Sequence, residues 1–419
     1  MTAARTAPAT VRPVVTGIGV LAPTGLDTET FWRAALRGTR AIGPVRRFDA
    51  DRYPVRLAGE LPSFDPAARV PARLLPQTDV WTQHGLAAAE AALADADLDP
   101  ATVPEYAFGV VTAASAGGVE FGQREIQNLW RHGARHVGAY QSIAWFPPAT
   151  TGQVSIRHGL RGHCETFVAE AAGGLDALAG AGRLLADGAW AVLGGATDSA
   201  LSPYGLVCQI TSGMLSPRSE PDRAYLPFTE EASGFVPAEG GAMFVLEEPA
   251  AAARRGARPL GVLAGHAATF DPPPGSGRPP GLRRAIEGAL RAAGVTPAEV
   301  DAVFADGLAV PAQDAQEARA LVDVFGPHGV PVTVPKAGTG RAYCGSAALD
   351  VAAALLSLRD GVLPPTPGVR RAAPAYRLDL VVDAPRRLPL RTVLVLSRGY
   401  GGFNAALVVR AADDGAGDG

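Results

Sequence analysis

The sequence is poor in cysteine and lysine and has no long apolar run, and each shortage excludes a class of protein. Its three cysteines, Cys164, Cys208 and Cys344, are odd in number and widely spaced. This pattern excludes a disulfide scaffold and a zinc cluster, and it predicts a reducing, cytoplasmic setting. No apolar run approaches the roughly 18 residues of a membrane helix, and the first residues lack a signal-peptide core. The net charge of −3 argues against a nucleic-acid partner.

Lysine is almost absent. Of the 38 basic residues, Lys336 is the only lysine and all others are arginine. Codon bias explains the general shortage, so the position that keeps a lysine becomes informative below.

Apolar residues, by contrast, are plentiful. They make up 47% of the 419 residues, while charged residues make up 19%, so the chain can bury a large core and is not disordered. Strand and helix patterns alternate, which predicts an α/β protein. The clearest helix is 282–293, with apolar residues at helical spacing. Residues 271–280 are too rich in proline for a regular element and predict a loop.

The order of parts repeats along the chain. A helix, a short Pro-Ala turn and a buried strand occur near residues 88–112 and again near 285–306, and Leu-Asp opens an Ala-rich helix at 175 and at 349. The repeat predicts two similar halves, 12–255 and 256–411, each of the βαβαβαββ type and packed in five αβαβα layers. Residues 412–419 are expected to be a disordered tail.

Four turns stand where an α/β fold places its chemistry, at the carboxyl ends of strands and at helix N-termini. In the first, 168–176 (VAEAAGGLD), a strand breaks into two glycines and a helix, a setting that would activate a nucleophile. Ala171 and Ala172 stand there instead, and neither can attack. The other three turns are 304–307, 336–341 and 399–404.

In this order and spacing, the turns resemble those of the β-ketoacyl synthases of the thiolase superfamily. Condensing members of that family carry cysteine at the first turn and histidine at the second and third. Here the three positions hold Ala171, Asp306 and Arg341. The resemblance also matches the supporting charged residues of the family to Asp314, Glu317 and Lys336. The only lysine therefore lies at a family position, which favours a retained structural ion pair.

These departures resemble one branch of the family, the chain length factors of type II polyketide synthases. The likeness extends from residue 12 to 411 and is carried by segments 121–130 (FGQREIQNLW), 136–145 (HVGAYQSIAW), 150–158, 169–177, 224–228 and 398–404. Chain length factors typically have glutamine where this chain has Ala171, so the decarboxylating role ascribed to that glutamine does not carry over.

The resemblance implies a non-condensing subunit that forms a heterodimer with a catalytic ketosynthase. The pair would extend a polyketide held by an acyl carrier protein, with no cofactor, and this chain would shape the acyl tunnel and set the product length. Two alternatives remain open. One is an enzyme, either a malonyl decarboxylase or a ketosynthase with relocated catalytic residues. The other is a homodimeric acyl- or carrier-binding protein.

Two groups of residues are candidates for binding roles. Val119, Gly122 and Ile126 share one face of a helix, and the resemblance places them where the family gates its tunnel. Their small or β-branched side chains predict a longer product than an aromatic gate permits, although the same face could simply pack against the partner. An aromatic-rich segment is expected at the heterodimer contact, with core packing as the alternative: Trp130, Tyr140, Trp145 and Phe146. The cysteines are expected to be small buried or edge residues.

Overall fold

The first half of the chain builds a mixed sheet of five strands. The structure, a computed structural model, describes residues 12–273 and 275–412, and so all but the first residue of the expected tail lie outside the described residues. The strand order from the centre of the molecule outward is β1 (Val14–Leu21), β7 (Glu239–Glu247), β6 (Ala191–Ser199), β4 (Phe108–Ala113) and β5 (Cys164–Phe167). All residues of the first four of these strands are buried.

The second half repeats this order. From the centre outward it runs β8 (Gly261–Phe270), β15 (Phe403–Arg410), β14 (Thr392–Gly399), β9 (Ala302–Phe304) and β10 (Pro331–Thr333), with β12 (Asp379–Leu380) added at the edge. The two sheets join through two pairs, Val14 with Val262 and Val15 with Gly261. The repeated order confirms the expected duplication. The division at residues 255 and 256 falls between α10 (Pro249–Arg254) and β8 and stays a prediction.

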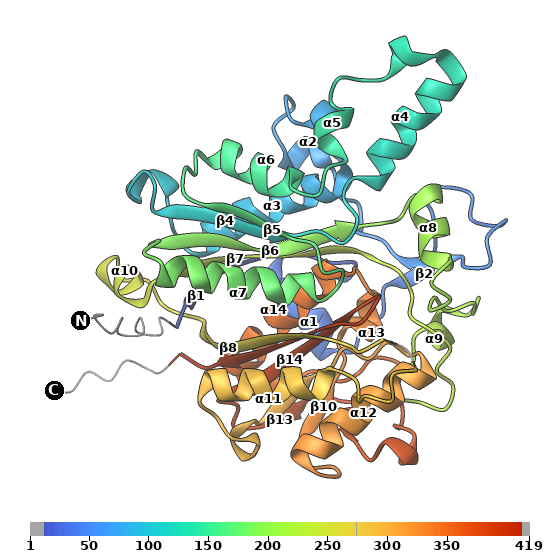
Figure 1. Cartoon of the computed structure of the whole chain (residues 1–419), viewed down its shortest axis with the longest axis vertical. Helices are drawn as coiled ribbons and strands as arrows, with labels where there is room; N and C mark the ends of the chain where they lie inside the picture. Colours follow the sequence, from blue (N-terminus) through green and yellow to red (C-terminus); the bar gives the residue numbers. More distant parts are fainter. Residues whose placement is uncertain (1–11, 274, 413–419) are drawn as a thin grey trace.

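Helices form three layers around the two halves of the sheet (Figure 1). The central layer contacts strands of both halves, and the outer layers contact one half each. The central pair is α7 (Gly173–Ala186) and α14 (Cys344–Asp360); the outer pairs are α3 (Val80–Asp95) with α6 (Ala149–His158), and α11 (Leu282–Ala293) with α12 (Pro311–Phe325). This is the five-layered, thiolase-like arrangement expected from the sequence.

Most elements lie where the pattern of apolar residues predicts them. All six apolar positions of α11 are buried: Leu282, Ala285, Ile286, Ala289, Leu290 and Ala293. The strand that leads into the first turn is β5, which ends at Phe167 because the chain leaves the sheet at the exposed Val168 and turns through Glu170, whose φ is +48°.

Shorter elements connect the layers. They are α1 (Thr28–Leu36), α2 (Pro66–Arg69), α8 (Pro203–Ile210), α9 (Pro221–Ala224), α13 (Lys336–Thr339), β2 (Ile42–Pro44), β3 (Leu57–Gly59), β11 (Val362–Leu363) and β13 (Arg386–Arg387). Within the described ranges, no helix combines the length and apolar character that crossing a membrane requires.

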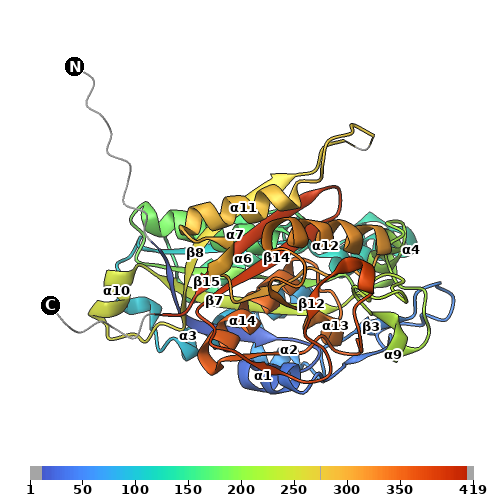
Figure 2. The same cartoon turned by 90° about the horizontal axis from the view of Figure 1, so that it is seen from below.

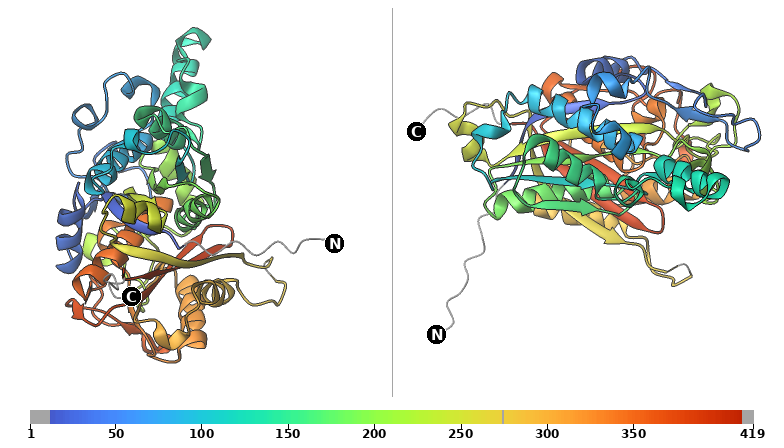
Figure 3. Two further views of the ribbon diagram at one scale, coloured as in Figure 1. Left: turned by 90° about the vertical axis from the view of Figure 1, so that its left-hand side faces the viewer. Right: turned by 90° about the horizontal axis from the view of Figure 1, so that it is seen from above.

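Two segments project from the body. The first, which we call the arm, comprises residues 119–146 with α4 (Val119–His132), the 3-10 turn η3 (Ala134–His136) and α5 (Gln141–Ala144); it stands out at one end of the molecule (Figure 1; Figure 3, left). The second is the proline-rich loop between β8 and α11, as expected for 271–280, which extends away from the layers (Figure 2).

Candidate functional site

The turn at the start of α7 offers no nucleophile. Ala171 is 1% exposed and sits two residues before the helix begins. Glu170, the residue before it, has a half-buried side chain whose Oε2 accepts from the Tyr400 backbone N–H at 2.8 Å. Burial raises the pKa of Glu170, while the charge of Arg341 lowers it. The first turn therefore lies beside the fourth and close to the third, with a methyl group at the reacting position.

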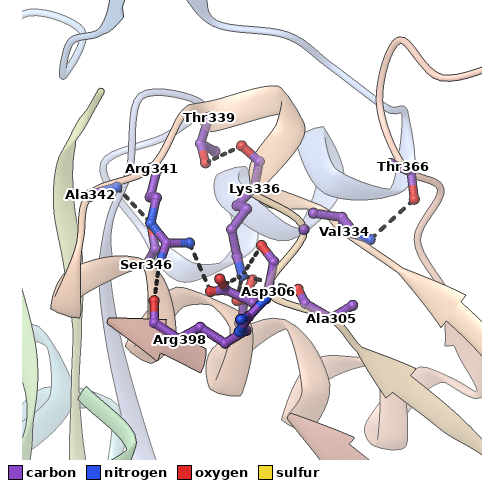
Figure 4. A network of polar contacts seen from close by, with 12 residues as sticks. Ala305, Asp306, Val334, Lys336, Thr339, Arg341, Ala342, Ser346, Thr366 and Arg398 are labelled. Carbon is purple, nitrogen blue, oxygen red and sulfur yellow. Dashed lines mark hydrogen bonds and ion pairs between the residues drawn. The ribbon is translucent and has the colours of Figure 1, made fainter. Parts of the chain in front are cut away.

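The two positions that the resemblance matches to the histidines of condensing members are joined by an ion pair. Arg341 Nη1 donates to Asp306 Oδ1 at 2.7 Å, and Arg341 Nη2 donates to the Arg398 carbonyl at 2.5 Å (Figure 4). Both side chains are 2% exposed or less. Burial opposes ionisation of Asp306, but Arg341 and Lys336 together bring the pKa of its carboxyl below the usual value. The two charges neutralise each other, so Asp306 presents no uncompensated negative charge at this turn.

Lys336 extends this pair into a buried network. Its Nζ lies 2.5 Å from Asp350 Oδ2 and 3.8 Å from Asp306 Oδ1, and it donates to the carbonyls of Ala305 and Asp306 at 3.1 and 3.2 Å. The expected ion pair of the only lysine is thus present. Burial raises the pKa of Asp350 to about 6, against the lowering by Lys336. Figure 4 shows Lys336 and Arg341 converging on Asp306 from α13 and the turn that follows it.

Glu317 and Asp314 accept hydrogen bonds from backbone N–H groups next to the network. Glu317 accepts the N–H groups of Asp306 and Gly307 at 2.7 and 3.0 Å, and Asp314 Oδ2 accepts that of Phe228 at 2.7 Å. Both carboxyls lie on α12 and are fully buried. Burial raises the pKa of both, that of Asp314 to about 8, with the neighbouring carboxyls adding to the effect. These contacts shape the turn rather than face a substrate.

Three participants were missed in the sequence. Arg398 is 5% exposed and donates to the Gln313 carbonyl, Gln313 Oε1 and Gln316 Oε1 at 2.9, 2.6 and 3.0 Å. Asp350 was visible only as part of the repeated Leu-Asp pair, and Glu170 only as part of the first turn. Their roles depend on contacts with residues elsewhere in the sequence, for which the local pattern carries no signal.

A cavity of about 700 Å³ opens onto these residues. Its wall includes Glu170, Arg341, Tyr343 and Arg398, and it is bordered by the loop after β8 and the turn between β14 and β15. Arg341 faces this space with both terminal nitrogens already engaged. No group of three or more metal-ligating side chains occurs among the described residues.

The three cysteines lie outside the four turns. Cys344 is buried, and its Sγ lies 3.2 Å from Asp198 Oδ2; burial and that carboxyl raise the pKa of the thiol, which makes it a poor nucleophile. Cys164 is exposed at the start of the edge strand β5. Cys208 lies on α8, exposed at the cavity wall, so the expectation of a buried or edge position is wrong for this residue. All three are free thiols.

The three candidate tunnel residues lie on α4, within its first turns. Val119 and Gly122 are half-buried, and Ile126 is 50% exposed. A Cβ added to Gly122 would lie 3.8 Å from Trp145 Cβ and 3.9 Å from Gln141 Nε2, which are ordinary contacts. The helix therefore has room for a Cβ at 122, next to Trp145.

The four candidate interface aromatics are all exposed in the single chain. Trp130 is the most exposed, at 82%, and Tyr140, Trp145 and Phe146 each expose two fifths or more. Together with Ile126 they give the arm an apolar surface that nothing in the described part of the chain covers. Core packing is thus not what these aromatics do here.

Comparison with known proteins identifies the family. The N-terminal domain model of β-ketoacyl synthases matches residues 12–252, and the C-terminal domain model matches 260–370. The ketoacyl synthase β subunit of the tetracenomycin polyketide synthase from Streptomyces glaucescens is 57% identical over 96% of this chain and 99% of the relative. The actinorhodin polyketide β-ketoacyl synthase 2 of Streptomyces coelicolor is 54% identical over 95% of this chain and 98% of the relative.

Solved structures agree with these relatives. A type II polyketide synthase ketosynthase, AntDE, in complex with its acyl carrier protein AntF and bound to the hexaketide, superposes with a TM-score of 0.86. Its sequence is 26% identical, and the match covers 96% of this chain and all of that one. The chain belongs to the β-ketoacyl synthase family and, within it, to the ketosynthase β subunits, or chain length factors, of type II polyketide synthases.

Proposed function

We propose that this chain is the non-condensing subunit of a cytoplasmic ketosynthase heterodimer, in which it shapes the acyl tunnel and sets the length of the polyketide. The partner is the catalytic ketosynthase subunit, and the growing chain is carried by the phosphopantetheine arm of an acyl carrier protein. The observation that carries the proposal is the buried Asp306–Arg341 pair together with Ala171.

Claisen condensation needs a thiolate to hold the acyl chain and groups that assist decarboxylation and stabilise the enolate. Ala171 cannot form a thioester. Arg341 keeps its proton near neutral pH, and its charge is already neutralised by Asp306 at 2.7 Å. The partner subunit must therefore supply the cysteine and both histidines.

The same geometry argues against malonyl decarboxylation by this chain alone. A malonyl carboxylate or the enolate it leaves would need an unengaged donor. The guanidinium of Arg341 donates instead to Asp306 and to the Arg398 carbonyl, and breaking those contacts would leave Asp306 buried without its cation.

The arm supports the heterodimer. Its exposed aromatic and aliphatic side chains form the kind of apolar centre that stable interfaces bury, and Trp130, Tyr140, Trp145 and Phe146 are the contacts we assign to the catalytic subunit. Since Val119, Gly122 and Ile126 lie on the same helix, the partner that covers the arm would close the tunnel over them. The tunnel then keeps a reactive polyketide away from water.

Reconstitution tests the proposal. The catalytic subunit, carrier protein and malonyl donor are assayed with this chain, without it, and with this chain as the sole ketosynthase-like subunit. We expect polyketide only when both subunits are present, and neither condensation nor carbon dioxide release by this chain alone. A heterodimer whose partner lacks its nucleophilic cysteine is the control and should be inactive. Turnover by this chain alone would contradict the proposal.

A further inference from the structure

The helix that carries the candidate tunnel residues has no capping side chain of its own. Its N-cap is Gly118, and a Cβ there would stand 2.2 Å from the Ala144 carbonyl oxygen and 2.9 Å from Asp79 Cβ. Serine, threonine or aspartate, the usual caps, are therefore excluded from position 118. Gly118 also donates its N–H to the Trp145 carbonyl at 3.0 Å, and this hydrogen bond joins the two ends of the arm.

Asp79, from another helix, takes over the capping of α4. Its Oδ2 accepts from the Phe121 N–H at 2.7 Å, and Phe121 is the third residue of α4, whose amide an N-cap side chain normally satisfies. Its Oδ1 accepts from the Trp81 N–H at 3.2 Å and so caps α3, the helix that Asp79 precedes. The carboxyl group of Asp79, a residue that is 2% exposed, therefore caps the N-termini of two helices.

The remaining side-chain contacts at the base of α4 are less enclosed. Arg47 reaches Glu120 at 3.2 Å, but the Glu120 side chain is 45% exposed. The backbone N–H of the exposed Tyr204 donates to Gln123 at 2.8 Å. Exposed contacts of this kind add little to the free energy of folding, whereas a buried, charge-assisted hydrogen bond adds substantially more. Asp79 is thus the most enclosed polar contact of the first two turns, beside the buried ring of Phe121.

We propose that Asp79 is a positioning residue for chain-length control: by capping α4 it holds Val119 and Gly122 in place, so that the tunnel ends at one depth. The inference rests on the proposed function, because it takes α4 to set the product length. To Asp79 it assigns the narrow distribution of that length. Burial raises the pKa of Asp79 to about 7, against the lowering by the two amides, as expected for a carboxyl kept in the interior for its hydrogen bonds.

Asp79→Ser separates the two caps. A serine hydroxyl can still cap the first turn of its own helix, but it is too short to reach Phe121. Asp79→Asn is the milder, isosteric variant: its NH2 group cannot accept, and its remaining oxygen makes a weaker hydrogen bond than a carboxylate oxygen does. Asp27→Ser is the matched control: Asp27 caps α1 by accepting from Thr30 N at 2.8 Å and touches no other helix.

Two measurements on the heterodimer, hydrogen exchange and product length, test the role of Asp79. In Asp79→Ser, hydrogen exchange of the first α4 amides should quicken about ten- to a hundredfold, the range for loss of a charge-assisted hydrogen bond, while α3 keeps its protection. The single product length should broaden into several, with total condensation largely kept. Asp79→Asn should do the same to a smaller degree, and Asp27→Ser should do neither.

An unchanged product length and unchanged α4 exchange in Asp79→Ser would overturn the inference. If that variant forms no heterodimer, the same unchanged readouts in Asp79→Asn would overturn it. Gly122→Phe is assayed alongside. A shift with Gly122→Phe but none with the Asp79 variants would reject only the role of Asp79, and no shift in any of them would reject the proposed function itself.

Discussion

Asp306 and Arg341 each stand where a condensing relative carries histidine, and each depends on the other. A single buried charge at either position costs several kcal/mol, whereas a hydrogen-bonded pair offsets much of that cost. Arg341 also stacks over the Phe235 ring at 5.5 Å and donates to the Arg398 carbonyl. The Asp306–Arg341 pair therefore acts as a structural contact that holds the second, third and fourth turns together.

Arg341→Met should destabilise the chain strongly because it leaves the buried Asp306 without its hydrogen-bonded guanidinium, with only the more distant Lys336 at 3.8 Å. We expect a loss of about 3–5 kcal/mol in the free energy of unfolding, measured by denaturant titration. Adding Asp306→Leu should recover part of the loss, since an apolar pair needs no charge compensation. Arg223→Met breaks the exposed Arg223–Glu231 pair and should cost at most about 1 kcal/mol. Equal losses in the two single variants would contradict a structural role for the buried pair.

Asp314 should make stability depend on pH. Burial raises the pKa of its carboxyl from 3.8 to about 8, so between those values the folded chain binds a proton that the unfolded chain has released. Stability should then fall as the pH rises through this window. In Asp314→Asn the fall of the melting temperature with pH should become shallower, whereas Asp222→Asn, at an exposed carboxyl, should leave it as it is. A slope unchanged in Asp314→Asn would contradict this assignment.

At the scale of elements, α4 has one apolar face that no other described residue of the single chain covers. Trp130 is 82% exposed and Ile126 50% exposed on that face. By contrast, α11 buries all six of its apolar positions against the sheet and α12. The difference marks α4 as the element that needs a partner.

Trp130→Ser should weaken the heterodimer without weakening the fold. Because tryptophan at an interface centre often contributes about 2 kcal/mol or more, we expect the Kd to rise roughly thirtyfold. The melting temperature of the single chain should not change, since the ring is exposed there. Tyr106→Ser is the control. Tyr106 is 72% exposed, but it precedes β4, whereas the arm follows β4. Equal affinities of Trp130→Ser and wild type would remove Trp130 from the interface.

The sequence predicted elements better than it predicted contacts between them. Helical spacing alone placed 282–293, because an amphipathic period reports which face is buried. The Asp306–Arg341 pair joins residues 35 apart on two separate turns, and no local pattern reports that they meet. The capping of α4 by Asp79 was equally hidden, since the two residues in contact are 42 apart. The candidate tunnel residues came from the family resemblance and the candidate interface residues from the aromatic composition of their segment, and both roles stay predictions.

At the scale of the molecule, duplication explains where the site lies. Each half packs one face of its sheet against the shared central layer of α7 and α14, and the turns of the site lie next to the starts of these two helices. The first half contributes the turn with Ala171, and the second contributes Asp306, Lys336 and Arg341. A fold built for condensation is thereby kept whole while its reacting groups are replaced by an alanine and a buried ion pair.

The most direct test of chain-length control is the product length made by a Gly122→Phe heterodimer. A Cβ at 122 meets only ordinary contacts, so the substitution starts without a backbone clash, and the added ring is expected to take up space in the proposed tunnel. Arg131→Phe adds the same ring nine residues on, about two and a half turns away and on the opposite side of α4, and serves as the control. The account predicts a shorter polyketide with Gly122→Phe and an unchanged one with Arg131→Phe; the wild-type length in both would contradict it.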